Sequence, residues 1–170
     1  MNIHPLTEET LDLELDLCLR CHPSGFTPRG SEVEEGRRLK KRFVREVLRR
    51  VRPAGFVAEE DGGPVALLEL MPREYARRSG YITGAGGVEG ETLTIVCLEV
   101  ARRYDRKEMM RVMVSHLARN LELFRPYGRI EVGAFPRDVD FHPAWVYREH
   151  GFQVAEDRDE AQVLTIQIPE

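Results

Sequence analysis

Two glutamates and one cysteine stand in apolar runs that have the length and composition of β-strands. Glu69 lies within VALLELM, and Cys97 and Glu99 lie within TLTIVCLEV. A carboxylate that is buried on a strand can act as a general base, because loss of hydration raises its pKa toward neutrality. Glu69 and Glu99 are therefore candidate proton acceptors, or else solvated strand residues. Cys97 has no base at a recognisable spacing, so we expect it in the core.

A second group of polar side chains, Asp138, Asp140 and His142, precedes a predicted short helix. Substrate-binding groups in α/β folds often lie where strands end, so these side chains are candidates for binding a substrate. Aspartates are also frequent in turns and helix caps, and this is the interpretation that we favour.

The sequence CLRCH at positions 18–22 matches the C-x-x-C-H pattern of c-type haem attachment. Nothing else in the chain suggests export or an apolar haem pocket, so we predict no haem. A zinc site needs four ligands, and His4, His22 and Cys97 meet only by long-range convergence, so no metal is predicted. The three cysteines favour reduced thiols over a disulfide framework.

Positive charge gathers between residues 37 and 52, which hold nine basic residues and one acidic residue in a chain of net charge -4. Such a run can bind phosphates, nucleic acid or an acidic partner. Its apolar residues recur at helical spacing, however, which predicts an amphipathic helix with its arginines turned to solvent. These apolar residues are Leu39, Phe43, Val44, Val47, Leu48 and Val51. Aromatic residues are scarce here, so nucleic-acid binding is not predicted.

The length of 170 residues, of which 42% are hydrophobic, suffices for one core, and we predict a single domain over residues 1–170. No stretch approaches the ~18 apolar residues that cross a bilayer, and the first residues do not resemble a signal peptide. We therefore expect a cytoplasmic protein that makes no membrane contact.

The predicted elements alternate in a way that indicates one α/β sheet. Residues 55–71 read as two strands of a hairpin around an Asp-Gly-Gly-Pro turn, and residues 92–100 read as a central strand. A helix over 106–124 joins that strand to another over 129–135, and such a crossover predicts parallel strands. Further predicted elements are helices over 10–20, 37–52 and 142–150 and strands over 152–155 and 162–168.

This order of elements resembles the GNAT superfamily of acyl-CoA-dependent N-acyltransferases over most of the chain. The most specific pieces are the hairpin GFVAEEDGGPVALLELMP, the strand ending CLEV before ARRYDRKEMM, and WVYREHGF, which is similar to the family's terminal helix. The resemblance implies an α/β (α+β) fold with a central mixed sheet of about six to seven strands, flanked by about four helices. It also implies acetyl-CoA as co-substrate, a small-molecule or peptide amine as acceptor, and the homodimers that are common in the family.

In that family acetyl-CoA lies where the strand matching residues 92–100 splays from its neighbour, and its pyrophosphate binds at the start of the next helix. The family's loop reads Arg/Gln-x-x-Gly-x-Gly/Ala, whereas this sequence has DRKEMM at positions 105–110. Carboxylates and bulk thus replace a cation and small residues, although main-chain N–H groups and nearby cations still attract a phosphate. The residues that the resemblance assigns to acetyl-CoA are Leu98, Val100, Arg102, Arg103, Arg106, Lys107, Glu108, Met109 and Met110.

Tyr147 stands four residues before Gly151, the spacing of the family's general acid. The resemblance implies that Tyr147 protonates the leaving thiolate, and the alternative is that it only packs with its hydroxyl satisfied. The family's usual basic carboxylate falls on Thr94, so Glu69 or Glu99 would serve instead. The leading interpretation is acetyl transfer to the primary amine of an unknown acceptor. The alternative is a non-catalytic GNAT-like domain that binds another ligand or a partner protein.

Overall fold

The computed structural model describes residues 1–20, 30–137 and 141–170. These residues form one seven-stranded mixed sheet in the order β1-β2-β3-β4-β5-β7-β6. Only β4 and β5 run parallel, as the crossover between them predicts, and all other neighbours are antiparallel. The strands are β1 (Asn2–Pro5), β2 (Gly55–Glu60), β3 (Gly63–Pro72), β4 (Thr92–Val100), β5 (Arg129–Ala134), β6 (Gln153–Asp157) and β7 (Gln162–Gln167).

Five α-helices and two short 3₁₀ turns accompany the sheet in the described part of the chain. The predicted helix over 106–124 ends earlier, because Asn120 leaves helical geometry and residues Leu121–Phe124 form a 3₁₀ turn. The basic helix ends at Leu48 and not at residue 52, and Leu39, expected on its buried face, is 51% exposed. The helices are α1 (Leu11–Arg20), α2 (Gly30–Leu48), α3 (Arg73–Arg78), α4 (Arg106–Arg119) and α5 (Ala144–Arg148).

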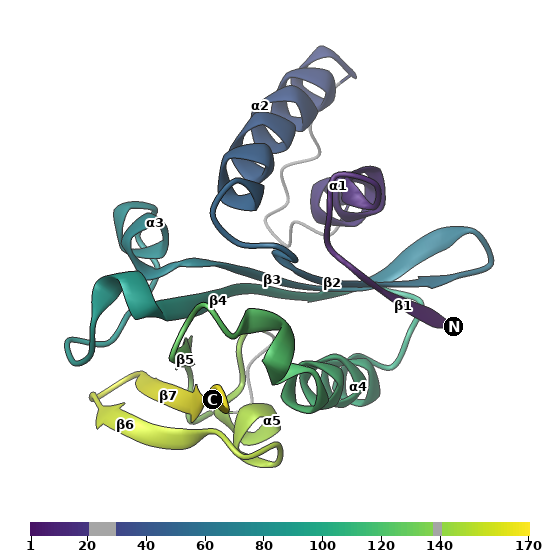
Figure 1. Cartoon of the computed structure of the whole chain (residues 1–170). Helices are drawn as coiled ribbons and strands as arrows, with labels where there is room; N and C mark the ends of the chain where they lie inside the picture. Colours follow the sequence, from purple (N-terminus) through teal and green to yellow (C-terminus); the bar gives the residue numbers. More distant parts are fainter. Residues whose placement is uncertain (21–29, 138–140) are drawn as a thin grey trace.

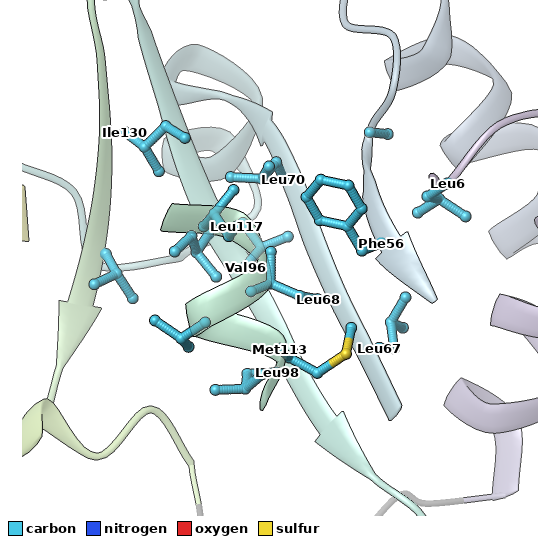
Figure 2. Close-up of a cluster of buried hydrophobic side chains, with 14 of the residues drawn as sticks. Leu6, Phe56, Leu67, Leu68, Leu70, Val96, Leu98, Met113, Leu117 and Ile130 are labelled. Carbon is cyan, nitrogen blue, oxygen red and sulfur yellow. The ribbon is translucent and has the colours of Figure 1, made fainter. Parts of the chain in front are cut away.

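Helices cover both faces of the sheet (Figure 1). Helices α1 and α2 lie on one side, where α1 packs on β3, and α4 and α5 lie on the other side. The spacing of Met110, Met113, Val114 and Leu117 gives α4 one apolar face, and that face is buried. Figure 2 shows Met113 and Leu117 gathered with side chains of β3 and β4 in the core.

The two central strands separate halfway along their length. β4 pairs with β3 over its whole length, from Leu93 to Val100. With β5 it pairs only from Thr92 to Ile95, where Ile95 lies opposite Val132. Val96 is an extra residue at a β-bulge in the β3–β4 ladder, and bulges bend a strand and increase its twist. Within the described residues, β4 beyond Ile95 therefore has no ladder to β5.

A buried ion pair fastens the end at which β4 and β5 do meet. Glu131 on β5 is fully buried and accepts hydrogen bonds from Arg73 Nε at 3.0 Å and Arg73 Nη2 at 2.5 Å. It also accepts one from Thr94 Oγ1 at 3.0 Å. Thr94 stands where the resemblance places a catalytic base, and here its hydroxyl supports a structural carboxylate. The strands part further along β4, beyond Ile95.

Candidate active site

The parting of β4 and β5 leaves a strand edge that offers main-chain groups. Residues Val96–Val100 form no ladder with β5, so part of their backbone must bond elsewhere or to a ligand. The predicted contact residues Leu98 and Val100 both lie on this stretch. Because such contacts use main chain, they do not depend on which side chains these residues carry.

Tyr147 brings a phenolic hydroxyl into the interior beside this edge. It comes from α5, where it is fully buried, and its ring packs edge-on against Phe152 at a centroid distance of 5.4 Å. Its hydroxyl oxygen lies 2.6 Å from Nδ1 of His142. Burial, and to a lesser degree the nearby Cys97, raise the pKa of Tyr147 well above its usual value. Tyr147 therefore keeps its proton at neutral pH and can give it up only to a strong base.

His142 is the residue that links Tyr147 to β4. Its side chain is 1% exposed, and burial lowers its pKa to about 4, although the Val96 backbone acts in the opposite direction. The imidazole is thus neutral at physiological pH and lies beside Val96, the first β4 residue without a β5 partner. Its Nε2 has no hydrogen-bond partner within the part of the chain that the structure describes. The backbone of His142 has a φ of 46°, an uncommon conformation for a non-glycine residue.

His142 lies in a bend just before α5, as the turn interpretation predicts, and its side chain is also buried against Tyr147. Asp138 and Asp140 lie outside the described residues, so the predicted cluster of three is not tested. Cys21 and His22 of the C-x-x-C-H sequence also lie outside them. Among the described residues, no group of three or more histidines, cysteines, aspartates or glutamates has metal-site geometry.

Glu69, one of the two predicted bases, is directly across from Cys97 in the β3–β4 ladder. Its side chain is 1% exposed, and its Oε2 lies 2.7 Å from the ammonium of Lys40 on α2. Glu14 on α1 completes the cluster, since its Oε1 lies 3.3 Å from the same ammonium and its side chain is fully buried. Burial, followed by the charge of Glu69, raises the pKa of Glu14 to about 8.

Glu14 was missed by sequence reasoning, although a signal for it exists. In the helix LDLELDL, Glu14 is three residues after the buried Leu11 and next to the buried Leu15, so it falls on the apolar face. A carboxylate on such a face must be paired or protonated. Glu99, the other predicted base, lies further along β4 with its side chain 18% exposed, and it pairs with Arg106 at 3.7 Å.

The start of α4, where the resemblance places the pyrophosphate, caps itself. The Asp105 carboxylate accepts a hydrogen bond from the Glu108 main-chain N–H at 2.9 Å, as expected of an N-cap aspartate. Met109 and Met110 are 7% and 1% exposed, so their side chains belong to the core. Arg102 and Arg103 line a groove of about 450 Å³ that is bounded by the β2–β3 turn. Asp16 and Asp61 line the same groove, so its charges are mixed.

Most basic residues of the segment 37–52 form intramolecular ion pairs. Six of the nine basic residues between positions 37 and 52 contact carboxylates, including Arg45 with Glu8 at 2.5 Å and Lys41 with Asp12 at 3.0 Å. This pattern agrees with an amphipathic helix that packs on α1. None of the helices in the described ranges combines the length and apolarity needed to cross a membrane.

Comparison with known proteins bears on the fold. No protein-family model matches the sequence, and no curated protein sequence matches it significantly. Many solved structures do match. The yncA protein from Salmonella typhimurium, solved with acetyl-CoA, has a TM-score of 0.65 and 12% identity, covering 100% of this chain and 95% of its own. The GNAT family N-acetyltransferase YhbS from Escherichia coli, solved with CoA, has a TM-score of 0.60 and 14% identity, covering 99% and 81%.

A third similar structure is the PaiA N-acetyltransferase from Thermoplasma acidophilum in complex with coenzyme A. Its TM-score is 0.57 with 12% identity, and the match covers 98% of each chain. Matches of this length leave no major part of the described sheet unaccounted for. The chain therefore has the fold of the GNAT N-acetyltransferases.

Proposed function

We propose that this chain is an N-acetyltransferase that moves an acetyl group from acetyl-CoA to a primary amine by direct attack in a ternary complex. The observation that carries the proposal is where Tyr147 lies. Its hydroxyl lies 2.6 Å from Nδ1 of His142, and His142 is near enough to the Val96 backbone for that backbone to affect its pKa. At Val96, β4 has lost its ladder to β5. A proton donor and an open strand edge thus coincide. Structures with this fold have been solved with CoA or acetyl-CoA, which supports the choice of co-substrate.

The edge of β4 that lies beyond its ladder with β5 suits the amide-bearing arm of CoA, because that arm would need only main-chain hydrogen bonds from residues such as Leu98. Bound acetyl-CoA supplies an acetyl thioester. Main-chain N–H groups on this edge would hold the thioester oxygen as it gains negative charge. At the start of α4, Arg102, Arg103 and Lys107 would oppose the repulsion from Asp105 and Glu108.

Each proton in the transfer has an assigned group. As the amine nitrogen bonds to the acetyl carbon and the carbon–sulfur bond breaks, the amine proton passes to a carboxylate and Tyr147 protonates the sulfur. Donation requires the tautomer of His142 in which Nδ1–H binds the phenolic oxygen, because the hydroxyl proton then points away from the imidazole. Glu69 is favoured over Glu99 as base, since it is buried and lies across from Cys97 near Tyr147.

The direct test is thiol release from acetyl-CoA in the presence of primary amines such as n-butylamine, spermidine and a peptide with a free amino terminus. Amine-dependent release is expected for at least one of them. Replacing Tyr147→Phe should lower kcat by about 10²-fold, the lower range for general acid catalysis, and leave the KM for acetyl-CoA nearly unchanged.

A matched control is Tyr127→Phe, because the Tyr127 hydroxyl donates to the Arg50 carbonyl and takes no part in the contact between Tyr147 and His142. This variant should keep the wild-type kcat. An unchanged rate in Tyr147→Phe would remove Tyr147 from the mechanism. If acetyl-CoA is bound but never consumed, the chain is instead a binding protein built on this fold.

A further inference from the structure

A lysine ammonium is held against two buried glutamates on the side of the sheet that α1 and α2 cover. Lys40 Nζ lies 2.7 Å from Glu69 Oε2 and 3.3 Å from Glu14 Oε1. The glutamate side chains are 1% and 0% exposed, whereas that of Lys40 is 23% exposed. The cation therefore approaches from the solvent side, and the two carboxyl groups form the floor.

This floor has more acceptor capacity than the structure uses. Glu69 Oε1 and Glu14 Oε2 have no hydrogen-bond partner among the described residues, and the contact of Glu14 Oε1 with the Lys40 ammonium, at 3.3 Å, is a long one. Buried polar atoms are nearly always bonded, because an unpaired one keeps its full desolvation cost. An ammonium group carries three donors and can be shared among several oxygens. The two glutamates thus form a site for a compact cation. The Lys40 ammonium occupies this site but contacts only part of it.

The floor also lies next to the centre at which we place the reaction. Glu69 is the cross-strand partner of Cys97, and Cys97 is near enough to Tyr147 to influence its pKa. Side chains directly opposite on antiparallel strands have Cβ atoms about 5 Å apart. One strand width therefore separates the ammonium site from the open edge of β4.

We propose that Glu14 and Glu69 bind the primary ammonium group of the acceptor, and that Lys40 is an internal stand-in which the acceptor displaces. Its role in catalysis rests on the proposed acetyltransferase function, whereas the binding of an ammonium does not. Lys40 can be displaced because its long side chain, which is partly exposed, can swing so that its ammonium group reaches solvent. A primary ammonium fits best, since a guanidinium is planar and a quaternary ammonium has no donors.

Removing the stand-in should expose the site to a free amine. In Lys40→Ala, the buried carboxyl groups lose their cation and the melting temperature should fall. Millimolar n-butylammonium chloride, which reproduces the end of a lysine side chain, should then raise the melting temperature saturably. The apparent affinity of Lys40→Ala for n-butylammonium should be about tenfold or more higher than that of the wild type, because in the wild type Lys40 competes for the site. Neither n-butanol nor tetramethylammonium should replace it, because each lacks the ammonium donors.

Lys41→Ala is the matched control, because Lys41 is the next residue of α2 and pairs with Asp12, which is 66% exposed. It should gain no stability from n-butylammonium. If Lys40→Ala fails to fold, Lys40→Met keeps the stem and tests the same binding. A second substitution, Glu14→Gln, should weaken the effect of the amine in either variant.

The proposal is overturned if n-butylammonium stabilises the Lys40 variants no more than it stabilises Lys41→Ala. The experiment contains no acetyl-CoA, so it separates two failures. Saturable amine binding without acetyl transfer by the wild type would leave the ammonium site standing and reject the enzymatic function. Acetyl transfer by the wild type without amine binding to the Lys40 variants would reject the ammonium site and support the enzymatic function.

Discussion

The Tyr147 hydroxyl and the His142 imidazole share a 2.6 Å contact in the interior, beside the point where β4 leaves β5. Both side chains are essentially buried, and neither reaches a charged partner through this contact. A neutral imidazole can fix a hydroxyl without taking its proton, because its lowered pKa makes it a weak base. In the proposed mechanism His142 would therefore position Tyr147.

Replacing His142 should impair turnover more than binding. In His142→Leu, the Tyr147 hydroxyl loses its partner, and kcat should fall about tenfold while the KM for acetyl-CoA changes little. In His142→Asn, the side-chain amide can still donate to the phenolic oxygen, so part of the rate should return. Steady-state kinetics of both variants check this prediction. Equal losses in the two variants, matched by equal losses of stability, would indicate a purely structural role.

The Glu14 carboxyl should make stability depend on pH in a defined direction. Its pKa is raised from 4.5 to about 8 in the folded chain, so folding binds a proton over that interval. The contribution is fully present below a pH of about 4.5 and is lost as the pH rises through about 8. Glu14→Gln, which resembles the protonated form, should remove this part of the dependence.

The free energies of unfolding of the wild type and of Glu14→Gln can be compared by urea unfolding at pH values between about 5 and 9, spaced about one pH unit apart. The free energy of unfolding of the wild type should decline relative to the variant as the pH rises. His142 has a pKa lowered to about 4, so its own contribution is lost on the acid side and cancels in the difference. A constant difference between the two proteins would show that Glu14 is not protonated in the fold.

The Asp105 cap should weaken acetyl-CoA binding through its charge alone. Asparagine caps helices as well as aspartate, so Asp105→Asn keeps the hydrogen bond to Glu108 and removes one negative charge. Affinity for acetyl-CoA should rise about fivefold at low salt, from about 1 kcal/mol of relieved repulsion, and the gain should shrink at high salt. Glu122→Gln, beyond the other end of α4, should leave affinity unchanged. No gain in Asp105→Asn would place the phosphates away from this helix start.

The buried pair of Arg73 and Glu131 should be a principal source of stability where β4 meets β5. Glu131→Gln leaves the buried Arg73 without its counter-ion, and this should lower the free energy of unfolding by about 3–5 kcal/mol. Thr94→Val, which removes one hydrogen bond to the same carboxylate, should cost about 1 kcal/mol. Denaturant unfolding measures both. If Glu131→Gln lowers the free energy of unfolding only slightly, water must solvate the Arg73 guanidinium in place of the carboxylate.

Local chemistry explains which parts of the fold the sequence predicts well. The apolar, β-branched run of β4 depends on neighbouring residues only, and it forms a strand as expected. β1 was missed because Asn2–Pro5 is short and mostly polar and is a strand only through pairing with β2. The short α3 helix was missed too, since its buried Arg73 is tied down by Glu131, which lies 58 residues away.

The candidate site was harder to predict, because its members come from separate elements. Tyr147 was recognised through the resemblance, but nothing in the sequence pairs its hydroxyl with His142. Glu69 was suspected from its strand, whereas Lys40 was one of many cations on a basic helix. Only the packing of α1 and α2 on β3 brings Lys40 and Glu69 together.

Calorimetric titration of acetyl-CoA into the protein tests the central claim most directly, because the roles proposed for Tyr147, His142 and Glu69 in acetyl transfer presume that acetyl-CoA binds along the edge of β4. The account predicts saturable binding at one site per chain, and stabilisation of the fold by about 2.7 kcal/mol at 100 times the dissociation constant. Absence of both heat and stabilisation at millimolar acetyl-CoA would contradict it.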